Sequence, residues 1–101
     1  MPEWSFLTNH ARVLMCIALD PGVRLRDIAT TLGITERSAY GIVKELTAAG
    51  YVVKEKDGRR NRYTIQADLP VRGGLGRERP IGDVLDLLVD TRARQRGRRR
   101  R

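Results

Sequence analysis

A pair of short amphipathic segments joined through one glycine constrains this chain more than any other feature. Residues 25–32 carry apolar side chains at positions i, i+3, i+4 and i+7 of a helix, namely Leu25, Ile28, Ala29 and Leu32. Gly33 follows where a left-handed residue commonly ends a helix, and Thr35 is a favoured capping residue for the next one. A second apolar stripe runs through residues 36–49, at Ala39, Ile42, Val43 and Leu46. The pattern predicts two helices joined by a tight turn.

An additional helix is expected upstream, beginning at Thr8 or Asn9 and ending near Leu19. The run 13–19 is apolar all round, which predicts a helix buried on more than one side. The turn-forming sequence Asp20-Pro21-Gly22 ends it. We expect the three helices to share one small core, which suits a chain of 101 residues with 41% hydrophobic content.

A β-hairpin is predicted after the helices. Two β-prone runs flank Asp57-Gly58, the strongest short hairpin signal. Tyr63 and Ile65 alternate with Arg62 and Thr64, so one face of the hairpin should be buried and the other wet. Helix, tight turn, helix and basic hairpin is the order of a winged helix-turn-helix. We therefore predict an α+β, mostly α fold with a three-helix core, a two-stranded wing and a short C-terminal helix.

Composition divides the chain into four parts. Residues 1–69 form the predicted winged-helix domain. Residues 70–80 hold three glycines and two prolines, which indicates a linker. Residues 81–91 regain helical periodicity, and residues 92–101 form a tail with seven arginines and no acidic residue, which we expect to be disordered.

The formal net charge of +8 is concentrated in that tail, because the other 91 residues carry 13 basic against 12 acidic side chains. A solvated terminus is one explanation of the tail. The other is an arm for a polyanion, which in cytosol usually means nucleic acid. We expect sequence-independent DNA contacts from its arginines: Arg92, Arg94, Arg96, Arg98, Arg99, Arg100 and Arg101.

The outer face of the predicted helix 36–49 is left free by its apolar stripe and fits the major groove of DNA. The candidate contacts on this recognition helix are Thr35, Arg37, Ser38, Tyr40, Gly41 and Lys44. Arg37 is the best candidate base reader, because arginine binds guanine O6 and N7 as a fork. The negative charges of Glu36 and Glu45 would repel DNA phosphates, so these two residues could instead orient Arg37 or Lys44. The wing is expected to reach backbone or minor groove through Lys56, Arg59, Arg60 and Arg62.

The stretch 25–52 resembles the helix-turn-helix of MarR-type transcriptional regulators. In that family an IA..LGI segment precedes a recognition helix that starts with Ser or Thr and ends in L...G before the wing. Asp57 and Arg59 fall where the family's wing often carries Asp-x-Arg. The resemblance covers residues 4–69 and implies a dimeric DNA-binding regulator, with a winged helix of the short single-domain type. It further implies DNA contacts from Thr35, Arg37, Ser38, Lys44 and Arg59.

The C-terminal segment is too short to be a stable helix alone, so it must dock on its own domain or on a second copy. Its apolar stripe comprises Ile81, Val84, Leu85 and Leu88. We favour the homodimer, because a palindromic DNA site and a two-fold protein explain each other. The expected dimer interface comprises Trp4, Ile81, Val84, Leu85 and Leu88.

The leading interpretation is a sequence-specific DNA-binding transcriptional regulator. A repressor is expected, although no residue decides the sign of regulation. An architectural nucleoid-type binder with little sequence preference stays open, as does a winged-helix module for protein or RNA. Competition with random DNA and binding of any duplex at low salt distinguish the three.

Several classes of function are not expected. We find no nucleophile–base–acid set, so the chain should not be an enzyme, and it should need no cofactor. His10 stands alone and Cys16 lies in the apolar run, so neither predicts a metal site; Cys16 should be a buried structural thiol. The sequence shows no residues typical of a ligand pocket, so a small-molecule effector is not expected. No apolar run reaches the ~18 residues that a membrane span needs, and we expect a bacterial cytoplasmic protein associated with the nucleoid.

Overall fold

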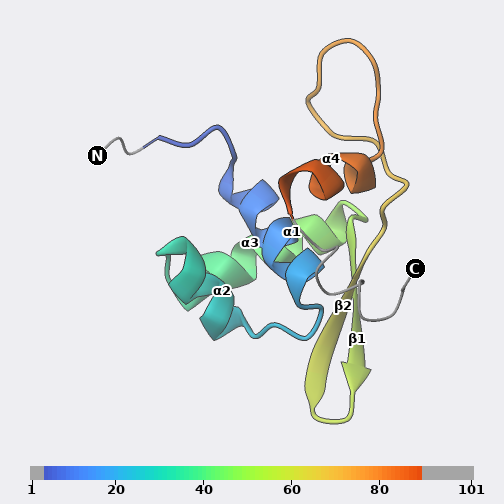
Figure 1. Ribbon diagram of the computed structural model, residues 1–101. Helices are drawn as coiled ribbons and strands as arrows, with labels where there is room; N and C mark the ends of the chain where they lie inside the picture. The colour runs from blue at the N-terminus through green and yellow to red at the C-terminus, as the bar shows by residue number, and fades with distance from the viewer. Residues whose placement is uncertain (1–3, 90–101) are drawn as a thin grey trace, which may run out of the picture.

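The computed structural model describes residues 4–89; the predicted arginine tail lies outside them. In the described part, four helices and one two-stranded antiparallel sheet form a winged helix, as the sequence predicts (Figure 1). The elements follow one another in this order: α1 (Asn9–Leu19), α2 (Leu25–Leu32), α3 (Glu36–Ala48), β1 (Val52–Asp57), β2 (Arg60–Ile65) and α4 (Ile81–Leu88).

Local signals mark the start of α1, the end of α2 and the start of α3. The Thr8 side chain accepts a hydrogen bond from the Ala11 N–H at 3.2 Å and so caps α1. Gly33 ends α2 with a φ of 74°, which a residue without Cβ adopts at little cost. Thr35 caps α3, accepting from the Ser38 N–H at 3.0 Å. The tight turn of the helix-turn-helix is therefore built by residues that the sequence singled out.

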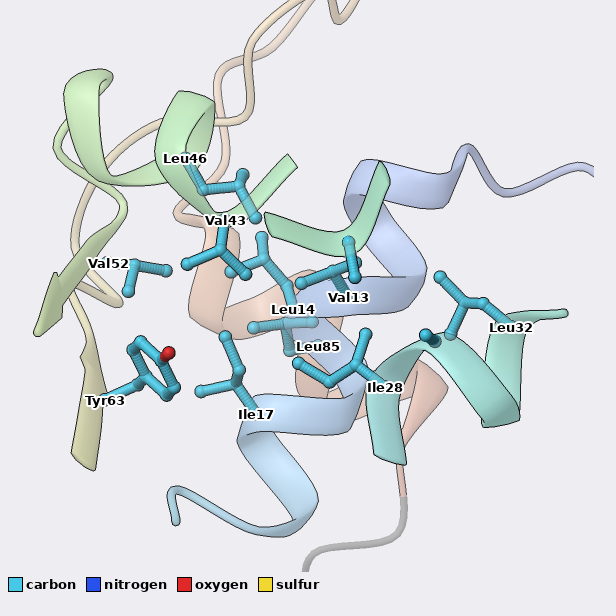
Figure 2. Packing of buried hydrophobic residues seen from close by; sticks show 12 residues of the cluster. Val13, Leu14, Ile17, Ile28, Leu32, Val43, Leu46, Val52, Tyr63 and Leu85 are labelled. Atoms are coloured by element: carbon cyan, nitrogen blue, oxygen red, sulfur yellow. The ribbon is translucent and has the colours of Figure 1, made fainter. Parts of the chain in front are cut away.

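The core lies around α1, which contacts α2, α3, β2 and α4. Figure 2 shows the side chains that meet there, and they come from every helix and from both strands. The labelled members are Val13, Leu14, Ile17, Ile28, Leu32, Val43, Leu46, Val52, Tyr63 and Leu85. Burial on more than one side of α1 is confirmed, and its apolar character is explained by four packing partners.

The wing is a hairpin in which Asp57 pairs with Arg60, so the two loop residues are Gly58 and Arg59. This shifts the turn by one residue from the predicted centre at Asp57-Gly58. Gly58 has a φ of 68°, and no other residue type takes a positive φ among those described. A positive φ at the first loop position alone fits a type II′ turn, whose twist matches the strands, whereas an Asp-Gly centre would need type I′.

The segment 70–80, predicted as a linker, forms a loop closed at its base, and it stands out from the domain beyond α4 (Figure 1). Its base is an isolated antiparallel bridge between Pro70 and Pro80, where the Val71 N–H bonds the Arg79 carbonyl at 2.9 Å. The loop therefore brings the chain back to where it left and directs α4 onto its own domain.

The C-terminal helix α4 docks in cis. Leu85 is 7% exposed and belongs to the shared core, beside α1. Gly82 donates to the Ala67 carbonyl at 3.0 Å, a close approach of two backbones. The helix ends at Leu88 and not near residue 91 as predicted. Val89 turns to an extended conformation, and its side chain is buried.

Candidate nucleic-acid interface

The outer face of α3 is open to solvent in the described structure. Ala39, Val43 and Leu46 face the core, which leaves the opposite side of the helix uncovered. Most of the predicted recognition residues lie there and are exposed: Thr35, Arg37, Ser38, Tyr40 and Lys44. The fold therefore gathers them on one helix face of the length that a major groove accepts.

Thr35 and Ser38 form one unit at the start of α3. Besides capping the helix, the Thr35 hydroxyl donates to the Ser38 Oγ at 3.0 Å. In this bond the Thr35 hydroxyl donates, and none of the hydrogen bonds among residues 4–89 has the Ser38 hydroxyl as its donor. The sequence named both residues but not this division between a capping and a presenting hydroxyl.

Gly41 is not required by packing. A Cβ built on it would meet no atom of the described chain within 4 Å. A glycine inside a helix costs about 1 kcal/mol relative to alanine. The molecule itself therefore supplies no steric reason for glycine at this position of the exposed helix.

Glu45 interacts with α1. Its carboxylate lies 2.6 Å from the Nε2 of His10, in the first turn of that helix. Glu45 is therefore directed to α1 and away from the role of orienting Lys44. The two residues are 35 positions apart, so no local pattern could have indicated their contact.

The exposed side chains of the wing differ in their neighbours. Arg62 lies directly opposite Glu55 in the sheet register, and Lys56 lies opposite Asn61. Opposite charges across a strand pair attract each other and weaken the local positive field. Lys56 faces no acidic residue in the register, and Arg59 lies in the turn beyond the last pair, Asp57 with Arg60. Lys56 and Arg59 are therefore the cations at the wing tip that have no acidic residue directly opposite.

Arg60 contacts the loop between α1 and α2. Its Nη2 donates to the Gly22 carbonyl at 2.8 Å, and the backbone N–H of Tyr63 donates to the Pro21 carbonyl at 2.9 Å. These two bonds attach β2 to the 20–22 loop. The sequence predicts Arg60 as a DNA contact, but the structure gives it a partner within the chain.

A groove of 510 Å³ runs between the start of α2, the start of α3 and the wing, and we call it the arginine groove. Among the residues that the structure describes, Glu36 is its one acidic side chain. The four arginines that line it come from two separate segments of the chain: Arg24, Arg26, Arg59 and Arg60. No described side chain caps α2, so its first backbone N–H groups also favour an anion.

Arg24 and Arg26 are the candidate functional residues that sequence reasoning missed. In the sequence they are only the polar face of a short helix. They become candidates only because Arg59, which lies more than 30 positions later in the sequence, lines the same groove. A surplus of arginine over acid in 24–26 was a visible signal, but nothing local connected it to the wing.

The predicted dimer residues separate into buried and exposed groups. The structure corrects the expectation for Leu85, because a side chain inside its own core has no surface for a second copy. Ile81 and Val84 are half-buried. Trp4 is 68% exposed and packs edge-to-face on Phe6, and Leu88 is 40% exposed. The sequence-based interface omitted Phe6 and Leu87, although both are more exposed than Trp4.

Residues 4–89 include no helix long and apolar enough to cross a membrane. They also include no group of three His, Cys, Asp or Glu side chains arranged to hold a metal ion. Cys16 is half-buried against the core, and burial raises the pKa of its thiol, with the nearby Arg12 charge opposing the shift. A raised pKa makes the reactive thiolate scarcer.

Comparison with known proteins agrees with this geometry. The family described as the MarR family matches residues 5–62, more than half of the chain, from the segment before α1 into β2. Helix α4 and the 70–80 loop lie outside the matched region. No curated protein matches the chain. The MarR family consists of DNA-binding transcription regulators, and by this match the chain belongs to the MarR family of winged-helix regulators.

Proposed function

We propose that this protein is a sequence-specific transcription regulator that binds duplex DNA through α3 and the wing. One observation carries the proposal: the uncovered face of α3 lies beside a wing with a basic tip, and the arginine groove joins the two. A duplex that receives α3 in its major groove offers its sugar-phosphate backbone to a flanking basic surface.

Arg37 is proposed as the principal base reader, because it lies in the first turn of α3, whose N-terminal residues meet base edges in this binding mode. We propose that the Ser38 hydroxyl donates to a base or phosphate and that Lys44, further along the helix, contacts a phosphate. Tyr40 is 52% exposed and can contact a thymine methyl or the backbone.

The decisive experiment is selection of duplexes from random genomic fragments, followed by competition with unrelated DNA. A regulator enriches a defined site and prefers it over random duplex. Arg37→Ala should reduce that preference by about 1–3 kcal/mol. Arg77→Ala, an exposed arginine of the 70–80 loop, removes the same charge away from α3 and the wing and should leave the preference unchanged.

The same experiment separates the alternatives. An architectural binder would show equal affinity for enriched and random duplexes. A module for protein or RNA would bind no duplex even at low salt, where non-specific DNA binding is strongest. Weakening of specific and random binding together in Arg37→Ala would reduce Arg37 to a phosphate contact.

We further propose that two copies bind one site. Regulators of this family usually act as dimers. The described surface offers exposed apolar side chains before α1 and on α4: Trp4, Phe6, Leu87 and Leu88. Leu87→Glu should favour the monomer in sedimentation and weaken binding to a two-half-site duplex, because the charge would have to be buried at the contact. An unchanged sedimentation coefficient would remove α4 from the interface.

A further inference from the structure

We propose that the four arginines of the arginine groove have two different tasks. Arg24, Arg26 and Arg59 contact phosphates of the DNA backbone strand that passes between α3 and the wing. Arg60 is a positioning residue, which holds the wing against the 20–22 loop. The first task rests on the proposed function, whereas the second is a property of the free protein.

The phosphate site follows from charge and location. The groove lies between the start of the helix proposed for the major groove and the wing. A DNA backbone strand that touches both α3 and the wing would therefore cross the arginine groove. Arginine binds phosphate oxygens through paired N–H groups, and Glu36 is the only acidic side chain in the described lining that opposes them.

The uncapped start of α2 adds a second, independent attraction for an anion. Arg24 is the N-cap residue, and its side chain makes no capping hydrogen bond. The start of α3 is different, because the Thr35 hydroxyl accepts from the Ser38 N–H there. Each first turn holds one acidic residue, Asp27 in α2 and Glu36 in α3, so the two helix starts differ in their capping and not in their first-turn charge. The start of α2 therefore keeps more backbone N–H groups without a side-chain partner, which favours a phosphate there.

Arg60 is set apart by its contact within the chain. Its guanidinium donates to the Gly22 carbonyl at 2.8 Å, and the loop is itself held by a 3.1 Å bond from the Gly22 N–H to the Asp20 Oδ1. A two-stranded hairpin is only marginally stable alone, so the angle of the wing depends on such attachments. The neighbouring bond from Tyr63 to Pro21 continues the same attachment along β2.

Salt dependence of DNA binding distinguishes the two tasks. Each phosphate contact contributes about 0.9 to the slope of log K against log salt. We expect Arg24→Ala, Arg26→Ala and Arg59→Ala each to flatten the slope by about that amount, on cognate and random duplex alike. Arg60→Ala should weaken cognate binding by a similar factor at every salt concentration and keep the wild-type slope. Arg77→Ala is the matched control and should change neither quantity.

Two outcomes would overturn this assignment. Wild-type slopes for both Arg24→Ala and Arg26→Ala would show that neither arginine contacts a phosphate, which overturns their assignment. A slope for Arg60→Ala flattened as much as that of Arg59→Ala would make Arg60 another phosphate contact. If the wild-type protein binds no duplex at low salt, the proposed function fails instead, and the result is distinct from either of these.

Hydrogen exchange in the free protein tests the positioning role without DNA. Arg60→Ala should speed exchange of the Tyr63 amide by about two- to tenfold, because that N–H donates across the same attachment. Arg59→Ala removes the same charge one residue earlier and should leave this amide at its wild-type rate. Equal rates in Arg60→Ala and wild type would overturn the positioning role.

Discussion

At the scale of single residues, Gly41 is a glycine that the packing of its helix does not require. Nothing in the described chain occupies the space where its Cβ would stand, and its helix would be more stable with alanine. The packing of the described residues therefore gives no reason for glycine here. We propose that the backbone of a duplex approaches α3 closely at this point.

Gly41→Ala tests this interpretation. We expect the free energy of unfolding to rise by about 1 kcal/mol, because helix propensity improves and no clash arises. Affinity for the selected duplex should fall. Denaturant unfolding and a binding titration give the two values. A more stable protein with unchanged affinity would show that the duplex does not approach here.

Tyr63 makes the stability of the fold depend on pH in the alkaline range. Burial raises the pKa of its hydroxyl above the ordinary value of 10.0, while a hydrogen bond with Asn61 opposes the shift. The unfolded chain therefore loses this proton first as the pH rises. Between the unfolded and folded pKa values the native state binds more protons, so stability falls as pH increases through this range.

Tyr63→Phe should remove part of that alkaline decrease in stability. The ring still fills the core beside Ile17 (Figure 2), so stability at neutral pH should change little. Unfolding free energies measured from pH 7 upward should fall less steeply above about pH 10 than in the wild type. Identical slopes in both proteins would show that another group causes the alkaline decrease.

At the scale of elements, the helix-turn-helix was the most predictable part of the chain. Thr8, Gly33 and Thr35 act on backbone groups a few residues away, so their effect is visible in the sequence. The wing was predictable as a hairpin, but its turn moved by one residue. Both Asp57-Gly58 and Gly58-Arg59 contain the needed glycine, and the strand register chose between them.

Helix α4 was predictable as a helix but not in its partner. An apolar stripe fits its own domain or a second copy equally well. Two tertiary features decided the matter: the bridge between Pro70 and Pro80, and the close approach of Gly82 to Ala67. A Cβ at residue 82 would stand 2.7 Å from the Ala67 Cβ, well inside contact distance.

Gly82→Ala should therefore loosen α4. We expect the free energy of unfolding to fall by about 1–3 kcal/mol, typical of overpacking at a tight contact. Amides of α4 should exchange faster than those of α1. Gly41→Ala is the matched control, since the same change in an open helical position should stabilise the protein. Equal stability of Gly82→Ala and wild type would show that Ala67 yields without cost.

At the scale of the whole molecule, arginines are concentrated in two parts of the chain, the arginine groove and residues 92–101. The arginine groove is a local feature of the described domain. Residues 92–101 carry seven arginines and lie outside the described residues. We propose that they add sequence-independent affinity, since neutralised phosphates release counterions whatever the base sequence.

Deleting residues 92–101 should weaken binding to every duplex and flatten the salt slope, by about 0.9 for each phosphate that the tail neutralises. The preference for the selected site should survive. A variant with the seven arginines changed to lysine keeps the charge and should retain most of the slope. A slope unchanged by the deletion would exclude the tail from DNA binding.

The sequence by itself determined the elements and their order, because helix caps, glycine turns and apolar periods act over a few residues. It also indicated the free face of α3, since that face is what the apolar stripe leaves over. The tertiary structure alone decided three further points: the docking of α4 in cis, the attachment of Arg60 to Gly22, and the meeting of Arg24 and Arg26 with Arg59. These depend on residues that approach one another only when the core closes around α1. A local sequence pattern cannot reveal contacts between residues so far apart in the chain.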